Sequence, residues 1–109
     1  PSSKRSKRAA IVRIFDDFPG RRFLLVGDSG ERDPDVYAAV ARQRPEQVAG
    51  VAIRRVPSSK PWPKVQRRLD QLAGLLPAGR LRVFTTAEEL ADLVQAGAPA
   101  GYQGLSKAF

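Results

Sequence analysis

The stretch RRFLLVGDSGERDPDVYAAV, residues 21–40, joins an apolar segment to a helical one through a short polar turn. Its RFLLV segment is a continuous apolar run that ends at Gly27, a pattern typical of a strand buried on both faces. Asp33 followed by Pro34 favours a helix start, because Asp can cap the free N–H groups of a first turn and proline fits there. The stretch therefore predicts a buried strand, a turn that begins with Asp28, and a helix from about Asp33.

Helical and extended segments alternate on both sides of this unit. Apolar spacing predicts a helix over residues 7–17 before it, a helix end near Arg44, a strand near residues 48–56, and a third helix marked by Val65, Leu69, Leu72 and Leu75. RLRVFTT, residues 80–86, predicts a third strand, and the capping box of residues 86–89 opens a last helix. The order indicates the α/β class, with a parallel sheet covered by helices on both faces.

A chain of 109 residues has room for one domain with one hydrophobic core. We expect a basic N-terminal tail over residues 1–5, an α/β domain over residues 6–96, and a flexible tail over residues 97–109, which contain three glycines and a proline. No apolar run approaches the roughly 18–20 residues of a membrane span, and no segment resembles a signal peptide. We therefore expect no transmembrane segment and a cytoplasmic location.

The chain contains neither cysteine nor histidine. Disulfides, thiolate chemistry, zinc fingers and histidine-based acid–base catalysis are thereby excluded for this sequence. A metal ion would have to be held by oxygen ligands, which points to Mg²⁺ or another hard cation.

The net charge of +8 suggests polyanions as partners, because lysine and arginine neutralise phosphates. The basic residues are nevertheless spread along the whole chain, and the densest cluster, KRSKR at residues 4–8, lies in a serine-rich stretch that a solvated terminus would also explain. Few aromatic residues argue against stacking of single-stranded bases. Nucleic acid is thus a weakly supported partner.

Two carboxylates flank the turn that follows the first strand. The spacing of Asp28 and Asp33 allows both to approach one oxygen-liganded cation. Asp33 could instead serve only as a helix cap, whereas an acidic Asp28 directly after a buried strand needs a positive partner to offset its desolvation. Ser29 and Gly30 could line a phosphate-binding turn with their backbone N–H groups, although a glycine also serves the turn itself.

Residues 6–56, about half of the chain, resemble the second half of the catalytic domain of the actin-patch type of phosphatidate phosphatase, a branch of the haloacid dehalogenase superfamily. The resemblance rests on a lysine at the head of a helix, FP closing that helix, FLLVGDSGERDP with a tyrosine three positions further on, and IR after the next strand. The later VFTTAEELADLVQAG is similar to the closing strand and helix of the family, but is generic.

The resemblance implies a Mg²⁺-dependent phosphatase on a three-layer, Rossmann-like fold. Such enzymes attack phosphorus with an Asp, form an aspartyl-phosphate and hydrolyse it with a second Asp. By the same resemblance, Lys7 would neutralise charge on nucleophile and phosphate, and Asp28 and Asp33 would hold Mg²⁺. Ser29, Gly30 and Arg54 would lie on the substrate side. The expected substrate is a phosphorylated compound, such as phosphatidate at a membrane surface.

The nucleophile segment of the family, Asp-x-Asp-x-Thr, does not occur in these 109 residues. Arg55 also stands where the family more often has an acidic residue. We therefore expect a partial fold that lacks the nucleophile strand and is inactive alone, as a truncated fragment rather than a self-associating chain or a gene remnant. The free edge of the RFLLV strand would then favour pairing with another chain.

Two other classes of function compete with this interpretation. One is a non-catalytic basic module whose N-terminus, Arg54 and Arg55 bind anionic lipid or nucleic acid. The other is a receiver-like regulatory domain with acidic residues around Mg²⁺, against which the lack of an acidic pair on an early strand counts.

Overall fold

The structure is a computed structural model that describes residues 3–30, 32–96 and 105–106. The elements in chain order are α1 (Ser3–Asp17), β1 (Phe23–Asp28), α2 (Asp33–Gln43), β2 (Val48–Arg54), α3 (Trp62–Ala73), β3 (Leu81–Phe84), α4 (Ala87–Ala96) and β4 (Leu105–Ser106). The predicted alternation of the first seven elements is confirmed. Helix α1 begins at Ser3 rather than at Lys7, and β2 ends at Arg54 rather than at residue 56.

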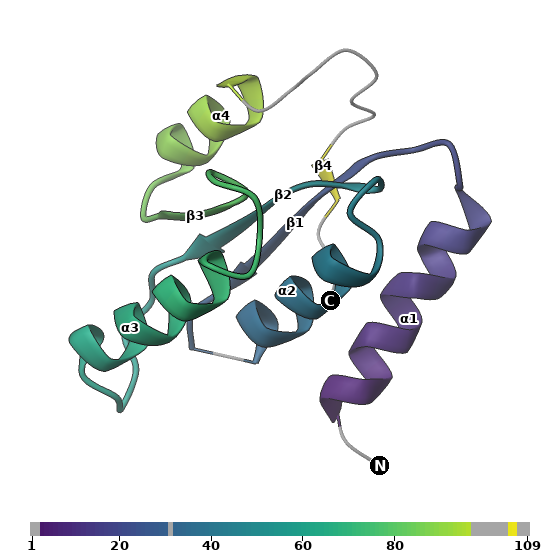
Figure 1. Cartoon of the computed structure of the whole chain (residues 1–109). Coiled ribbons are helices and arrows are strands. Elements are labelled where there is room, and N and C mark those ends of the chain that lie inside the picture. Colours follow the sequence, from purple (N-terminus) through teal and green to yellow (C-terminus); the bar gives the residue numbers. More distant parts are fainter. Residues whose placement is uncertain (1–2, 31, 97–104, 107–109) are drawn as a thin grey trace.

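The four strands form one parallel sheet in the order β3-β2-β1-β4 (Figure 1). Strand β1 therefore lies inside the sheet, which explains why its apolar residues are continuous rather than alternating. Its register with β2 places Asp28 beside Arg54 at the carboxyl edge. Ligands of such sheets bind at this edge.

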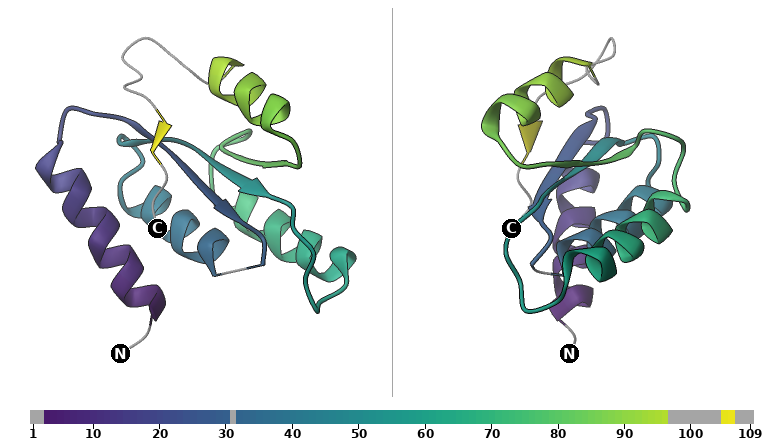
Figure 2. Two further views of the ribbon diagram at one scale, coloured as in Figure 1. Left: turned by 180° about the vertical axis from the view of Figure 1, so that it is seen from behind. Right: turned by 90° about the vertical axis from the view of Figure 1, so that its left-hand side faces the viewer.

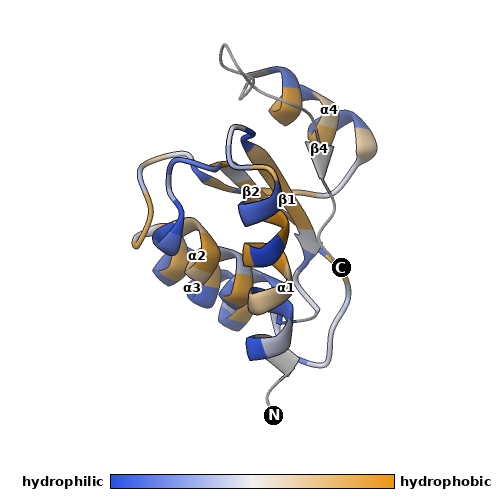
Figure 3. Cartoon of the chain, turned by 90° about the vertical axis from the view of Figure 1, so that its right-hand side faces the viewer, coloured by the Kyte–Doolittle hydropathy of each residue, from blue (hydrophilic) through white to orange (hydrophobic). Residues whose placement is uncertain are grey.

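Helices cover both faces of the sheet, as expected. Figure 2 shows α1, α2 and α3 on one side and α4 on the other. The larger cluster of buried side chains joins β1 and β2 to α1, α2 and α3, and includes Ile11, Phe15, Tyr37 and Ile53. A smaller cluster lies under α4, where Leu24, Ala52 and Phe84 meet Leu90, Leu93 and Val94. In Figure 3 the strands are largely apolar, whereas the helices carry both apolar and polar residues.

Hydrogen bonds from Arg44 and Gln47 connect the end of α1 to the start of β2. The Gln47 side-chain amide is buried, and its Nε2 donates to the carbonyl oxygens of Phe15 at 3.0 Å, Phe18 at 3.1 Å and Arg21 at 3.5 Å. Arg44 donates to Gln47 Oε1 at 3.1 Å and to Asp16 at 2.6 Å. Because the last carbonyls of a helix have no partner within it, this amide provides the C-terminal cap of α1.

The predicted helix ends are confirmed in part. Thr86 caps α4 as expected, since its Oγ1 accepts the N–H of Glu89 at 3.1 Å, and the Glu89 carboxylate in turn accepts the N–H of Thr85. Leu75 was expected on the inner face of the third helix, but α3 ends at Ala73 and Leu75 is 52% exposed.

The outer edge of β1 is paired in part. Strand β4 aligns its two residues with Leu24 and Leu25 of β1. Self-association through the remaining edge stays a prediction, and most of the expected tail over residues 97–109 lies outside the described residues. None of the helices in the described part of the chain is long and apolar enough to cross a membrane.

Candidate functional site

The carboxyl end of β1 lies directly against the first turns of α2. A Cβ atom at Gly27 would lie 2.6 Å from Asp33 Oδ2 and 2.7 Å from the Tyr37 ring. Contacts this short do not occur between real side chains, so glycine is the residue that lets the helix approach here. Gly27 thereby fixes where Asp33 sits relative to the end of the strand.

Asp33 is oriented toward the strand and does not cap its own helix. Helix α2 begins at Asp33 with Arg32 at the N-cap position, and no side chain makes a capping hydrogen bond there. The interpretation of Asp33 as a helix cap is therefore wrong. The carboxylate instead accepts the backbone N–H of Asp28 through Oδ2 at 3.3 Å, and it is almost completely buried.

Lys7 reaches this carboxylate from α1. Its Nζ lies 3.3 Å from Asp33 Oδ1, although the two residues are 26 positions apart. The lysine side chain is 29% exposed, so its charge faces both the buried carboxylate and solvent. A pairing of this kind lowers the cost of burying Asp33. The structure thus brings together Lys7 and Asp33, two of the residues that the sequence singled out.

Asp28 presents its carboxylate at the same edge and is half-buried. Its Oδ1 accepts the N–H of Gly30 at 3.1 Å, which holds the side chain over the turn. No group of three or more acidic residues that could hold a metal ion occurs in residues 3–30, 32–96 and 105–106. The described residues offer the carboxylates of Asp28 and Asp33 as oxygen donors at this edge, and Mg²⁺ is commonly bound through one or two carboxylates together with water.

Tyr37 connects the two carboxylates to the core. Its hydroxyl donates to the carbonyl oxygen of Val26 at 3.2 Å, and its side chain is fully buried. Burial raises the pKa of the Tyr37 phenol far above its usual value, and the negative charges of Asp33 and Asp28 raise it further. Both carboxylates therefore lie close enough to the Tyr37 hydroxyl to disfavour its ionisation.

Ser29 and Arg54 join the two strand ends. The Ser29 N–H donates to the Arg54 carbonyl at 2.9 Å, and Ser29 Oγ accepts the N–H of Val56 at 3.0 Å. These bonds continue the sheet past the ends of β1 and β2 and give Ser29 a structural role. The Arg54 side chain is exposed at this edge. Contacts of Ser29, Gly30 and Arg54 with a substrate stay a prediction.

The sequence did not indicate that Tyr37 and Gly27 contribute to the candidate site. Tyr37 and Gly27 read in the sequence as a core residue and a turn residue, and only the close approach of α2 to β1 shows their part in the site. The Arg55 guanidinium lies over the Trp62 ring, 4.1 Å from its centroid, and its expected contact with anions stays a prediction. Such cation–π contact places its guanidinium against α3.

The sequence model described as "Phosphatidate phosphatase APP1, catalytic domain" matches residues 1–55, and Lys7, Asp28, Asp33 and Arg54 all lie within this range. Phosphatidate phosphatase APP1 of Saccharomyces cerevisiae is 45% identical over 53 residues, which cover 49% of this chain and 9% of that protein. An uncharacterized protein of Schizosaccharomyces pombe is 36% identical over 52 residues, 48% of this chain and 9% of its own length.

No solved structure matches the chain. The aligned segment is about a tenth of the length of these two relatives, so it compares one part of each protein with half of this chain. The range that the family model matches contains strand β1, helix α2 and the lysine of α1, which together build the edge described above. The chain belongs to the family of the phosphatidate phosphatase APP1 catalytic domain.

Proposed function

We propose that the chain carries the magnesium-binding and lysine half of a phosphatase site that hydrolyses phosphate monoesters, with phosphatidate as the substrate class. The observation that carries the proposal is the pairing of Lys7 with the buried Asp33 directly beside Asp28, at the carboxyl edge of a parallel sheet. Family membership supports the same substrate class, because the yeast relative is named for phosphatidate.

Asp28, Asp33 and Lys7 have different roles in the proposed site. Asp28 serves as the direct ligand on this proposal. Its carboxylate is half-exposed and accepts a backbone N–H at one oxygen, whereas both oxygens of Asp33 are engaged. Asp33 positions the Lys7 ammonium, which can offset the negative charge of a bound phosphate. Bound Mg²⁺ would supply Lewis-acid polarisation of a phosphoryl oxygen.

Nucleophilic attack requires a carboxylate that these residues do not supply. The family's Asp-x-Asp-x-Thr segment is absent from the 109 residues, and Asp33 is occupied by Lys7 and the Asp28 N–H. Hydrolysis through an aspartyl-phosphate therefore needs a nucleophile strand from elsewhere in the polypeptide. On this proposal the 109-residue chain alone is inactive.

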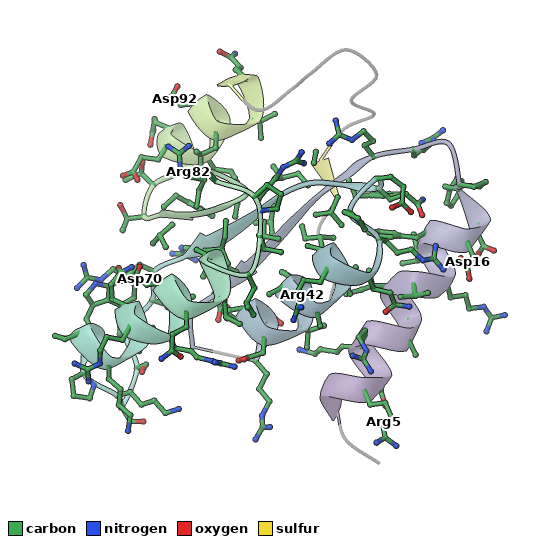
Figure 4. The ribbon with its side chains drawn as sticks, in the orientation of Figure 1. Arg5, Asp16, Arg42, Asp70, Arg82 and Asp92 are labelled. Carbon is green, nitrogen blue, oxygen red and sulfur yellow. The ribbon has the colours of Figure 1, made fainter. Side chains whose placement is uncertain are left out.

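Asp28→Asn should weaken Mg²⁺ binding by roughly tenfold or more, because it removes the more accessible negative ligand. Folding should change little, since the Asn side-chain oxygen can still accept the Gly30 N–H. Isothermal titration with Mg²⁺ measures the affinity and urea denaturation the stability. Asp92→Asn, on the exposed face of α4 (Figure 4), makes the same charge change away from the site and should leave the affinity unchanged. Equal Mg²⁺ affinities of the two variants would show that Asp28 is not a ligand of the metal.

Phosphatase activity tests the function itself. The 109-residue chain and the polypeptide extended upstream through a nucleophile segment are each assayed on phosphatidate and on an aryl phosphate, with and without Mg²⁺. We expect Mg²⁺-dependent hydrolysis by the extended polypeptide alone. Hydrolysis by the 109-residue chain would contradict the need for a second segment, and hydrolysis by neither would contradict the phosphatase proposal.

A further inference from the structure

A cavity of about 630 Å³ opens beside the Asp28–Asp33 edge. One wall is the turn between β1 and α2, represented by Ser29, Gly30 and Pro34. The opposite wall consists of the loop over residues 57–60 and the adjacent face of α3. In Figure 1 the link from β1 to α2 and the start of α3 lie on the same side of the sheet. The cavity thus extends from the turn that lies between Asp28 and Asp33 to a helix outside the range that the family model matches, although neither carboxylate lines it.

The α3 wall of this cavity is strongly basic. Lys64, Arg67, Arg68 and Gln71 all line it, and their spacing of three, four and seven positions puts them on one face of the helix. Lys60 adds a further cation from the loop. Val65 and the buried Leu69 of the inner face also line the cavity, so the basic stripe borders an apolar floor.

The positive charge of this wall is only partly neutralised. Asp35 is the one carboxylate among the cavity-lining residues, and it pairs with Arg68, which also donates to Gln71 at 3.3 Å. Within the part of the chain that the structure describes, Lys60, Lys64 and Arg67 form no ion pair. Like charges gathered around a concave surface repel one another unless an anion joins them, and a cavity concentrates their potential.

We propose that this cavity binds a phosphate group, held by Lys64 and Arg67 with Lys60 at the rim. The Gly30 turn connects the cavity to the metal-binding edge, since Gly30 lines the cavity while its N–H donates to Asp28 Oδ1 at 3.1 Å. The cavity therefore selects ligands that carry phosphate next to the candidate metal site. Its part in substrate recognition rests on the proposed function, whereas anion binding itself does not.

The double variant Lys64→Gln/Arg67→Gln tests the assignment. The control is Arg42→Gln/Arg82→Gln, which makes the same charge change at exposed residues of α2 and β3 that do not line the cavity (Figure 4). Binding is measured without Mg²⁺ in low salt, first with inorganic phosphate and then with phosphatidylcholine vesicles that contain or lack phosphatidate. We expect roughly tenfold weaker binding in the cavity variant and unchanged binding in the control.

The two probes separate the sources of the phosphate. Weaker binding of inorganic phosphate assigns the cavity to soluble phosphate compounds, and a loss restricted to phosphatidate-containing vesicles assigns it to a lipid head group; both support the proposal. Equal binding by the cavity variant and the control with both probes would overturn it. Titration of Mg²⁺ into the cavity variant separates a failure of the cavity proposal from a failure of the proposed function. The Asp28 site should bind the ion as in the original chain, whether or not the cavity binds phosphate.

Discussion

Replacing Gly27 by alanine is expected to lower the free energy of unfolding by about 3 kcal/mol or more. The added Cβ would lie 2.6 Å from Asp33 Oδ2, 2.7 Å from Asp33 Cβ and 2.7 Å from the Tyr37 ring. None of these atoms can move away without a large energetic cost. Tyr37 is completely buried, and the Asp33 Cβ is fixed to the backbone of the first turn of α2. The helix has to move away from the strand to accept the methyl group.

Urea denaturation of the 109-residue chain measures this change. Gly20→Ala is the matched control, because a Cβ at Gly20 meets no atom within 4 Å and should leave stability within about 0.5 kcal/mol of the original. The displaced helix also carries Asp33 away from Lys7 and the Asp28 N–H. Gly27→Ala should therefore weaken Mg²⁺ binding even where most molecules are still folded. A stability equal to that of Gly20→Ala would contradict the close approach of α2 to β1.

The order of elements was predictable because local patterns determine it. The apolar run of β1, the Asp-Pro pair at the start of α2 and the capping box before α4 each act over a few residues, and the structure confirms all three elements. The start of α1 was placed too late, at Lys7 instead of Ser3, since the residues before Lys7 are polar and show no periodicity. Helix residues without a buried face leave no mark in the hydrophobic pattern.

The site was predictable only in part, because its members come from distant segments. Asp28 and Asp33 are five positions apart, so a single turn places them together. Lys7 reaches Asp33 across 26 positions through the packing of α1 beside α2, which no local pattern determines, and its role came from the resemblance alone. The basic wall of the cavity also depends on how α3 packs, so the sequence showed its arginines and lysines only as dispersed charge.

Gln47 is a structural residue whose importance local sequence patterns also do not reveal. In the sequence it is one polar residue in a loop between a helix and a strand, and neither spacing nor composition distinguishes it from Gln43, which is exposed. In the structure its Nε2 donates to the carbonyl oxygens of Phe15, Phe18 and Arg21, at and just after the end of α1. Its Oε1 accepts a hydrogen bond from Arg44. A buried amide with this many partners is costly to replace.

Gln47→Leu is expected to lower the free energy of unfolding by about 2–3 kcal/mol, because a side chain of similar size fills the space but donates no hydrogen bond. The bond to the Phe15 carbonyl is buried while the other two are partly so, and the Phe15 and Phe18 carbonyls each keep one backbone N–H donor. Gln43→Leu makes the same chemical change at the exposed end of α2 and should alter stability by less than about 0.5 kcal/mol. Urea denaturation of both variants gives the comparison. Similar stabilities would show that the amide does not cap α1.

Gln47→Glu separates hydrogen bonding from packing. At pH 7 its carboxylate can only accept, so one oxygen would face the carbonyl oxygens of Phe15 and Phe18 while the Arg44 guanidinium meets the other. We expect burial and the two carbonyls to outweigh Arg44, so that the folded state raises the pKa of this side chain above the usual value of about 4.3. A raised pKa contributes stability that is present below the unfolded value and is lost as the pH rises through the folded value. The deficit of Gln47→Glu relative to the original chain should therefore shrink as the pH falls through the raised folded pKa and be smallest below about pH 4, whereas the deficit of Gln47→Leu should not depend on pH. A pH-independent deficit in both variants would assign the effect to packing rather than to the three hydrogen bonds.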